Sequence, residues 1–181
     1  MDAAVLDYVR ELHGGSHVLH PFDNPKSRDQ VFVEFVRGAI QKDLAVVHLS
    51  DDVERDRRLV SELGILEKPS KQIRIIPIGD AYKPATYTRQ VPLEFWMKEL
   101  KQTEAAGFAG LRGSVDDTIL DRWGLFPELV EAERIFGRTI ASNITVLCMY
   151  DANVLNLEQF LKPLLSAHGH VIFPGFATSL I

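Results

Sequence analysis

Hydrophobic runs in this chain repeatedly end on polar or acidic residues, and helical patterns follow them. Four of these runs are mostly apolar and cover residues 18–22, 44–49, 108–115 and 144–149, and an aspartate follows each within two residues. Alternation of strands and helices predicts an α/β fold with a mostly parallel sheet. Ligands of open parallel sheets bind beyond the carboxyl ends of the strands, so the pattern predicts a pocket at that edge.

Periodicity also sets the expected elements. Apolar runs predict strands at residues 17–22, 44–49, 73–78, 108–115, 144–149 and 170–173. Apolar residues at helical spacing predict helices at 2–12, 27–42, 51–64, 93–106, 127–141 and 157–167. The chain shows no internal repeat, linker or low-complexity tract, so residues 1–181 are expected to form one domain.

The connection between the third predicted strand and the next helix, residues 79–92, is rich in Tyr, Pro and Thr. It is long for a compact domain, and long connections often serve as lids or binding loops. This segment is therefore predicted to form a mobile lid, with Tyr82 and Tyr87 facing the pocket.

Composition narrows the class of protein. The 181 residues include 46% hydrophobic and 25% charged residues, as in ordinary globular domains, and the net charge is −5. The acidic balance argues against a nucleic-acid-binding surface, and no apolar run approaches the roughly 20 residues of a membrane span. The single cysteine, Cys148, excludes an internal disulfide, and the N-terminus lacks the pattern of a signal peptide, which together indicate a cytoplasmic location.

The turn after the first predicted strand reads Asp-Asn-Pro-Lys-Ser-Arg over residues 23–28. A P-loop requires a glycine-rich turn that ends in Gly-Lys-Ser/Thr, because its backbone amides and its lysine hold the phosphates. This turn has no glycine, and Asp23 would place negative charge against a phosphate. ATP hydrolysis by a P-loop mechanism is therefore not expected.

The histidines do not show the spacing of a metal site. Period-two alternation places His17 and His20 on opposite faces of their strand. His168 and His170 share a face, but no acidic residue or cysteine stands at ligand spacing from them. No metal is therefore expected, and Cys148, within an apolar strand, is expected to be an inert core thiol.

Arg112 lies inside an otherwise apolar strand, where an unpaired charge is costly. It is expected either to form a structural ion pair or to face a ligand. Its candidate ion-pair partners are acidic residues of the predicted sheet edge and of the helix that follows: Asp116, Glu131, Glu133 and Asp151. Aromatic residues that are candidates for the core or for a cavity wall are Phe22, Tyr82, Tyr87, Trp123 and Tyr150.

Five segments of the chain carry a further pattern. They are residues 15–22, 106–112, 131–133, 146–151 and 168–172. The first resembles the Gly-Asp-His-x-Cys-x-Phe-Tyr opening of the MEDS domain (methanogen/methylotroph sensory domain), and the fourth resembles its Cys-x-Tyr-Asp strand. The others are similar to its Gly-x-x-x-Leu-Arg strand, its acidic helix and its terminal His-Pro-x-Val-Ile. The resemblance covers residues 15–173.

The resemblance implies a RecA/KaiC-like three-layer sandwich that lacks a working P-loop. It also implies a sensory role with small organic ligands, hydrocarbon derivatives among them. Relatives often carry DNA-binding or kinase output domains, so the output is expected to pass through a signalling partner or a homo-oligomer. The chain departs from the family pattern at His20-Pro21, at Asp116 in place of Glu, and at Trp123, which stands later than the family's Trp.

The combined prediction is a non-catalytic sensory domain of signal transduction or transcriptional regulation, with no named cofactor. A small organic ligand is expected at the carboxyl edge of the sheet, with an anionic or carbonyl group held by Arg112. The predicted ligand-binding residues are His17, Phe22, Arg112, Asp116, Glu133, Tyr150 and Asp151. Two alternatives stand beside it: a degenerate RecA-like nucleotide binder or small-molecule enzyme that uses the same edge, and a structural interaction module whose edge is filled.

Overall fold

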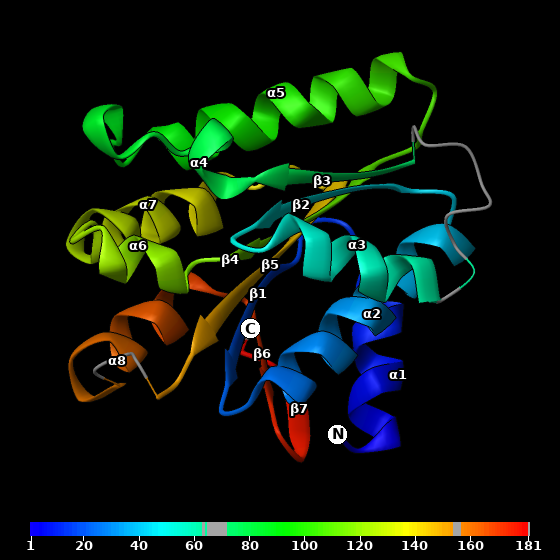
Figure 1. Ribbon diagram of the computed structural model, residues 1–181, viewed down its shortest axis with the longest axis horizontal. Helices are drawn as coiled ribbons and strands as arrows, with labels where there is room; N and C mark the ends of the chain where they lie inside the picture. The colour runs from blue at the N-terminus through cyan, green and yellow to red at the C-terminus, as the bar shows by residue number, and fades with distance from the viewer. Residues whose placement is uncertain (63, 65–71, 154–156, 181) are drawn as a thin grey trace.

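A seven-stranded sheet forms the centre of the computed structural model, which describes residues 1–62, 64, 72–153 and 157–180 (Figure 1). The strand order is β3-β2-β4-β5-β1-β6-β7. The strands are β1 His17–Phe22, β2 Ala45–Ser50, β3 Ile73–Pro77, β4 Leu111–Asp116, β5 Ile144–Asp151, β6 His170–Phe173 and β7 Phe176–Ser179. Neighbouring strands are parallel, except that β6 and β7 are antiparallel. The predicted mostly parallel α/β sheet is therefore confirmed.

Helices cover both faces of this sheet. One face carries α1 Ala3–Glu11, α2 Pro25–Gln41 and α3 Val53–Glu62 (Figure 1). The other face carries α4 Ile78–Ala81, the 3-10 turn η2 Pro84–Thr86, α5 Val91–Ala105, α6 Thr118–Arg122, α7 Phe126–Thr139 and α8 Leu157–Ala167. The third helix was predicted to end at Gly64, where the chain turns with a φ of 66°, and residue 63 before it lies outside the described residues. Among the described helices, none combines the length and the apolar character needed to cross a bilayer.

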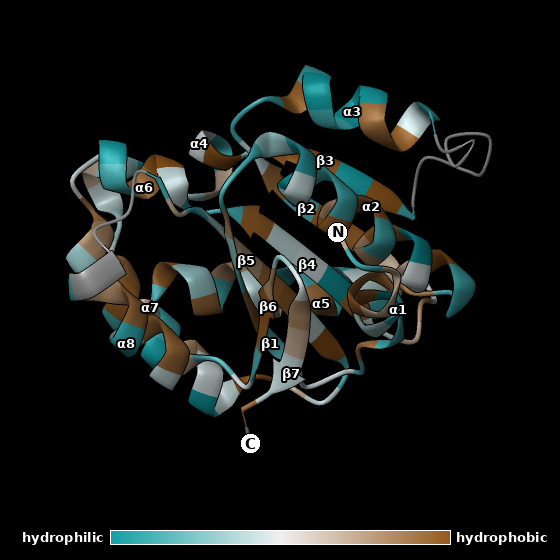
Figure 2. Ribbon diagram, turned by 90° about the horizontal axis from the view of Figure 1, so that it is seen from below, coloured by the Kyte–Doolittle hydropathy of each residue, from teal (hydrophilic) through white to brown (hydrophobic). Residues whose placement is uncertain are grey.

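Two hydrophobic cores result, one on each side of the sheet. Successive strand residues alternate between them: Val18 packs against α1 and α2, whereas Leu19 packs on the face of α7 and α8. Because both faces are covered, β1, β2 and β4 are buried along their whole length. Figure 2 shows hydrophobic segments along the central strands, between the two groups of helices.

Two strands differ from the prediction. β4 begins at Leu111 rather than at 108, because the chain first turns back onto α5, where the main-chain N–H of Phe108 donates to the carbonyl of Thr103 (3.2 Å). Gly107 permits this turn with a φ of 92°, a conformation that favours glycine. The short β7 was not predicted, and it pairs with β6 through a hairpin.

Residues 79–92 form helical turns rather than an open loop. Tyr82 and Tyr87 lie in the core, with 1% and 8% of their surface exposed. Their rings meet edge to face at 5.7 Å, and the ring of Tyr82 meets Phe95 at 5.9 Å. The expectation of an open loop is therefore wrong, because aromatic packing fixes this connection to α5.

The buried guanidinium of Arg112 joins α1 and α2 to the sheet. It donates hydrogen bonds to the main-chain carbonyls of Phe35 (2.8 Å), Arg10 (2.9 Å) and Leu12 (2.7 Å). A Cβ atom on Gly38 would collide with this guanidinium, so glycine is required where α2 passes it. The predicted ion pair with Asp116, Glu133 or Asp151 is wrong, because carbonyl oxygens at the other end of β4 satisfy the charge instead.

We predict that Arg112→Met lowers the free energy of unfolding by about 2–4 kcal/mol, because it leaves buried carbonyl oxygens without donors. Equilibrium unfolding in urea, followed by circular dichroism, measures this change. The matched control is Arg57→Met on α3, where the side chain is exposed and the expected change is within about 0.5 kcal/mol. Equal effects of the two substitutions would contradict the structural role of Arg112.

Candidate functional site

A cavity of about 260 Å³ lies at the carboxyl edge of the sheet, where β1, β2, β4 and β5 end. Strand ends and the first turns of α2, α3 and α6 form its wall. We call it the edge pocket, and its lining residues are Phe22, Pro25, Arg28, Asp51, Arg55, Asp116, Thr118, Arg122 and Asp151. The fold thus brings Phe22, Asp116 and Asp151 of the predicted site together at the predicted edge.

A buried ionic network forms the floor of the edge pocket. The guanidinium of Arg28 holds both carboxylate oxygens of Asp56, at 2.6 and 3.0 Å. Asp56 also accepts a hydrogen bond from the hydroxyl of Ser50 (2.6 Å) and lies 2.8 Å from Nε2 of His48. Burial alone would raise the pKa of Asp56, but hydrogen bonds from His48 and Arg28, together with their charges, outweigh burial and hold the pKa well below its usual range. Asp56 is therefore a stable carboxylate that fixes Arg28.

Arg28 connects this floor to the pocket. Its Nε lies 3.7 Å from the carboxylate of Asp116 and has no hydrogen-bond partner within the described residues. Burial raises the pKa of Asp116, and the charge of Arg28 opposes that rise. An incompletely satisfied guanidinium and a carboxylate therefore meet on the pocket wall.

The rim of the edge pocket is held by ion pairs of Asp51. Its carboxylate lies 3.4 Å from Nη2 of Arg55 on α3 and 3.1 Å from Nη2 of Arg122 on α6. Arg122 is 59% exposed, so its side chain can turn toward a ligand at little energetic cost. Arg55 is 32% exposed and is held more firmly, because its Nε also donates to the buried carboxylate of Asp56 (3.1 Å). The pocket therefore offers cationic groups on its floor and on its rim.

The start of α2 leaves no room for a phosphate-binding loop. Only Asp23 and Asn24 separate the end of β1 from the first residue of α2. The side chain of Asn24 caps the helix by accepting a hydrogen bond from the main-chain N–H of Ser27 (2.9 Å). A P-loop would need several glycine-containing residues here with free amides, so this segment has neither the length nor the donors.

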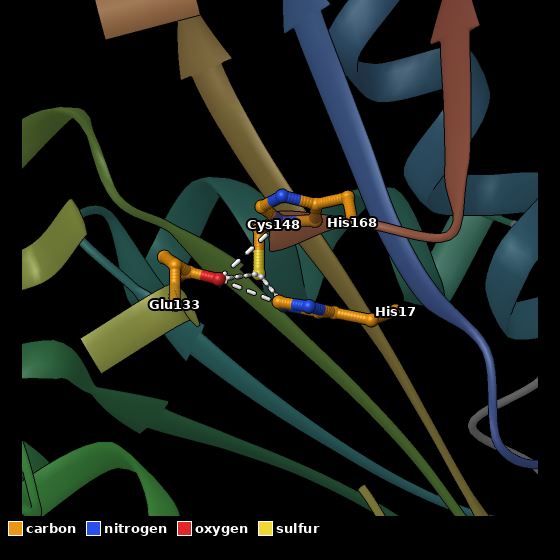
Figure 3. Close-up of side chains that lie close together, drawn as sticks. All are labelled: His17, Glu133, Cys148 and His168. Carbon is orange, nitrogen blue, oxygen red and sulfur yellow. Dashed lines mark hydrogen bonds and ion pairs between the residues drawn. The ribbon is translucent and has the colours of Figure 1, made fainter. Parts of the chain in front are cut away.

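Three further predicted residues, His17, Glu133 and Tyr150, lie on the opposite face of the sheet. A buried polar cluster forms there from His17, Glu133, Cys148 and His168 (Figure 3). The carboxylate of Glu133 lies 2.7 Å from Nε2 of His17 and 3.3 Å from Nε2 of His168, and the two imidazole rings stack at 3.8 Å. Tyr150 adds its hydroxyl, which donates to the other carboxylate oxygen of Glu133 (3.2 Å).

Burial shapes the ionisation of this cluster. Burial alone would raise the pKa of Glu133, but the charge of His17 and then the close contacts of the carboxylate with His168 and His17 outweigh burial and lower the pKa below its usual range. Burial, and then the charge of Glu133, raises the pKa of the Cys148 thiol. Asp117 lies on the same side, and burial followed by the charge of Glu133 raises its pKa as well. Glu133 is therefore the carboxylate that stays ionised, whereas burial favours the protonated forms of Cys148 and Asp117.

The structure therefore distributes the residues of the one predicted site over three places. Phe22, Asp116 and Asp151 line the edge pocket, and His17, Glu133 and Tyr150 belong to the cluster, whereas Arg112 belongs to neither. The arginines of the pocket, Arg28, Arg55 and Arg122, were missed. Their positions in the sequence could have revealed them, because all three arginines stand in the first turns or at the ends of helices that follow strand ends.

The absence of local ligand spacing around the histidines did not reveal the acidic and cysteine partners that the fold brings to them. His17 and Cys148 lie on the neighbouring strands β1 and β5, with Sγ 3.5 Å from Nε2. Glu133 comes from α7, and His168 follows α8. These residues are far apart along the chain, so local spacing gave no sign of the cluster.

Comparison with known proteins places the chain in a family and in a fold. The model of the MEDS family, described as the methanogen/methylotroph, DcmR sensory domain, matches residues 16–168. A search of curated proteins finds no match.

Two solved structures share the fold at low sequence identity. The protein PH0250 from Pyrococcus horikoshii OT3 aligns over 97% of this chain and 90% of its own, with 10% identity and a TM-score of 0.59. The flagellar accessory protein FlaH from Methanocaldococcus jannaschii aligns over 97% of this chain and 83% of its own, with 12% identity and a TM-score of 0.55. These likenesses confirm the RecA-like α/β architecture.

We predict that Asp56 makes the protein sensitive to acid. A depressed pKa in the folded state stabilises the fold above the unfolded value, about 4, and this stabilisation is lost as the pH falls below it. Asp56→Asn should cost about 3–5 kcal/mol at neutral pH, because it leaves the buried Arg28 incompletely paired. It should also flatten the fall in stability between about pH 4 and pH 2.

Urea unfolding at several pH values tests this prediction, with Asp80→Asn at an exposed position as the control. The control should keep the wild-type pH dependence. An Asp56→Asn variant with the same acid sensitivity as wild type would show that another group governs the transition.

Because the turn of two residues before α2 cannot form a phosphate-binding loop, we expect the protein not to bind nucleotide tightly. Calorimetric titration with ATP and magnesium should show no dissociation constant in the low micromolar range, which would correspond to about −8 kcal/mol. Lys26→Ala should leave the titration unchanged, because no phosphate is held beside this lysine. Tight binding that Lys26→Ala abolishes would restore the nucleotide-binding alternative.

Proposed function

This chain belongs to the MEDS family of sensory domains, and on that premise we propose that it binds a small organic molecule in the edge pocket and signals through a partner protein or a second copy. The observation that carries the proposal is the position of the pocket, at the carboxyl ends of four strands of a parallel sheet. Ligands of such sheets bind there because loops and helix starts surround the strand ends. The role is recognition without turnover.

The size and charge of the pocket favour a short ligand with a polar, oxygen-bearing end. Its volume of about 260 Å³ lies below the roughly 300–1,000 Å³ of sites for drug-sized molecules. Arg28 and Arg122 supply donors for a carboxylate or carbonyl oxygen, a role that we transfer to them from Arg112. Phe22 and Pro25 supply an apolar wall for the rest of the molecule.

The rim suggests how binding would be transmitted. Asp51 links Arg55 on α3 with Arg122 on α6 across the mouth of the pocket. An anionic ligand that takes over one of these arginines weakens the link, and α3 and α6 are then free to shift relative to each other. Such a shift changes the outer surface of the domain, where a partner or a second copy would bind.

We predict that Arg122→Ala weakens ligand binding about tenfold or more while the fold stays intact, since a hydrogen bond to a charged group contributes about 1.5–3 kcal/mol and an exposed ion pair contributes little to stability. Saturation-transfer NMR with a panel of short carboxylic acids, aldehydes and alcohols measures binding. Arg134→Ala on α7, which removes another exposed ion pair, is the control.

At least one panel member should bind wild type and the Arg134→Ala variant and lose affinity for the Arg122→Ala variant. The proposal fails if no compound binds, or if Arg122→Ala leaves every affinity unchanged. Line broadening of α3 and α6 amides on binding would support transmission through the rim.

A further inference from the structure

Four side chains of different chemistry converge in the buried cluster. His17 comes from the start of β1, Glu133 from α7, Cys148 from β5 and His168 from the turn after α8. One nitrogen, oxygen or sulfur atom of each lies within 4.8 Å of those of the other three. All four residues are buried, and Figure 3 shows their ends pointing toward one another. Two imidazoles, a thiol and a carboxylate are a ligand set that binds zinc.

The hydrogen bonds behind the imidazoles orient both rings toward the centre. Nδ1 of His17 lies 3.0 Å from the carbonyl oxygen of Ala167, and Nδ1 of His168 lies 2.7 Å from that of Leu164. A carbonyl oxygen only accepts, so each Nδ1 carries the hydrogen. Each ring therefore directs Nε2 toward the cluster and, in its neutral form, offers the lone pair of that atom there, as metal-bound histidines do.

One ring nitrogen at the centre of the cluster lacks a hydrogen-bond partner in the described part of the chain. Nε2 of His168 is buried and has no hydrogen-bond partner within the described residues, although Glu133 lies 3.3 Å away. An ionised carboxylate is also only an acceptor. The cluster therefore gathers two imidazole nitrogens, a thiol and a carboxylate oxygen around one point, and a bound cation would satisfy the nitrogen of His168 that has no hydrogen-bond partner among the residues that the structure describes.

We propose that His17, Glu133, Cys148 and His168 bind a single Zn²⁺ ion in tetrahedral geometry. This site lies across the sheet from the edge pocket and goes beyond the function proposed above, because neither site needs the other in order to bind.

The separations of the ligand atoms suit this geometry. Bonds of about 2.0–2.3 Å to zinc place neighbouring ligand atoms roughly 3.3–3.8 Å apart. Sγ of Cys148 lies 3.5 Å from Nε2 of His17 and 3.7 Å from Oε2 of Glu133, and Nε2 of His168 lies 3.3 Å from the same oxygen. The 2.7 Å between Nε2 of His17 and the carboxylate of Glu133 has to widen by less than the length of a bond, and the remaining pairs lie within 4.8 Å.

The charges also balance. When the ion binds, the Cys148 thiol loses its proton to solvent, and the thiolate and the Glu133 carboxylate together neutralise the two positive charges of zinc. A neutral site avoids the large cost of burying an isolated charge. Tyr150 holds the carboxylate oxygen that faces away from His17 and His168, and so orients Glu133 as an outer-shell partner.

The fold also provides an approach from solvent. A surface cavity of about 290 Å³ is lined by Gly137, Ala167 and His168, beside the cluster. A Cβ atom on Gly137 would collide with the carbonyl of Ala167 and crowd Nδ1 of His17, so glycine lets α7 bring Glu133 close to β1. The ligands therefore lie one layer of side chains below the surface.

Cobalt substitution tests the site directly. The full chain is stripped with a chelator under reducing conditions and titrated with Co²⁺, which reproduces tetrahedral zinc geometry and absorbs visible light. Because Cys148 is the only cysteine, a thiolate-to-cobalt charge-transfer band reports coordination by this residue alone. We expect that band and intense visible bands at one equivalent, and Zn²⁺ should abolish both by displacement.

Variants separate coordination from folding. Cys148→Ser should remove the charge-transfer band, and Tyr150→Phe, which keeps the ring in the core, should weaken Zn²⁺ binding about 10- to 100-fold. His13→Ala, at an exposed histidine, should bind like wild type. If Cys148→Ser does not fold, the spectrum of the wild-type protein and the Tyr150→Phe affinity decide the matter.

The proposal is overturned if folded wild-type protein shows no charge-transfer band, or if Zn²⁺ binds equally to the wild type and the Tyr150→Phe variant. Loss of small-molecule binding in the Arg122→Ala test would leave this result unaffected, because Arg122 contacts only the edge pocket. The two proposals therefore fail or succeed separately.

Discussion

Helices cover both faces of the central strands, so a polar side chain on these strands must find its partner inside the protein. A buried polar group without a partner costs several kcal/mol. The chain solves this problem in three ways: carbonyl oxygens receive Arg112, an ionic network holds Asp56, and imidazoles surround Glu133. Each solution leaves one nitrogen without a hydrogen-bond partner among the described residues: Nε of Arg112, Nε of Arg28 and Nε2 of His168. Arg28 also lines the edge pocket, and His168 also lines the surface cavity beside the cluster.

The hydrophobic pattern was sufficient to predict the fold, because the periodicities of strands and helices are local properties of the sequence. Six of the seven strands were predicted, and β7 was missed because it is short and exposed at the sheet edge. The carboxyl edge could also be predicted, since strand direction follows from chain order in a parallel sheet. Phe22, Asp116 and Asp151 stand at strand ends and therefore reached the predicted pocket.

The errors in the site have physical causes of a different kind. Arg112 stands four residues before Asp116 on the same strand, and about 3.3 Å per residue puts them roughly 13 Å apart, beyond an ion pair. The buried cluster required knowledge of strand order. Once β1 and β5 are neighbours, His17 and Cys148 fall on one face of the sheet, but the sequence alone does not say which strands are adjacent. Glu133 and His168 then depend on how closely α7 and α8 pack, which Gly137 decides.

Two pairs of adjacent residues, one at the end of β4 and one at the end of β5, connect the edge pocket with the buried cluster. Asp116 faces the edge pocket and Asp117 lies on the other side, with both carboxylate oxygens buried and without partners among the described residues. On the next strand Tyr150 holds Glu133 and Asp151 lines the pocket. One peptide unit therefore separates the two environments at each position. If the sites proposed above are occupied, an event in one that moved this shared main chain would act on the other, and by linkage the effect would carry equal free energy in the reverse direction. The covered sheet that forces polar groups to pair internally thus also brings the edge pocket and the buried cluster close together.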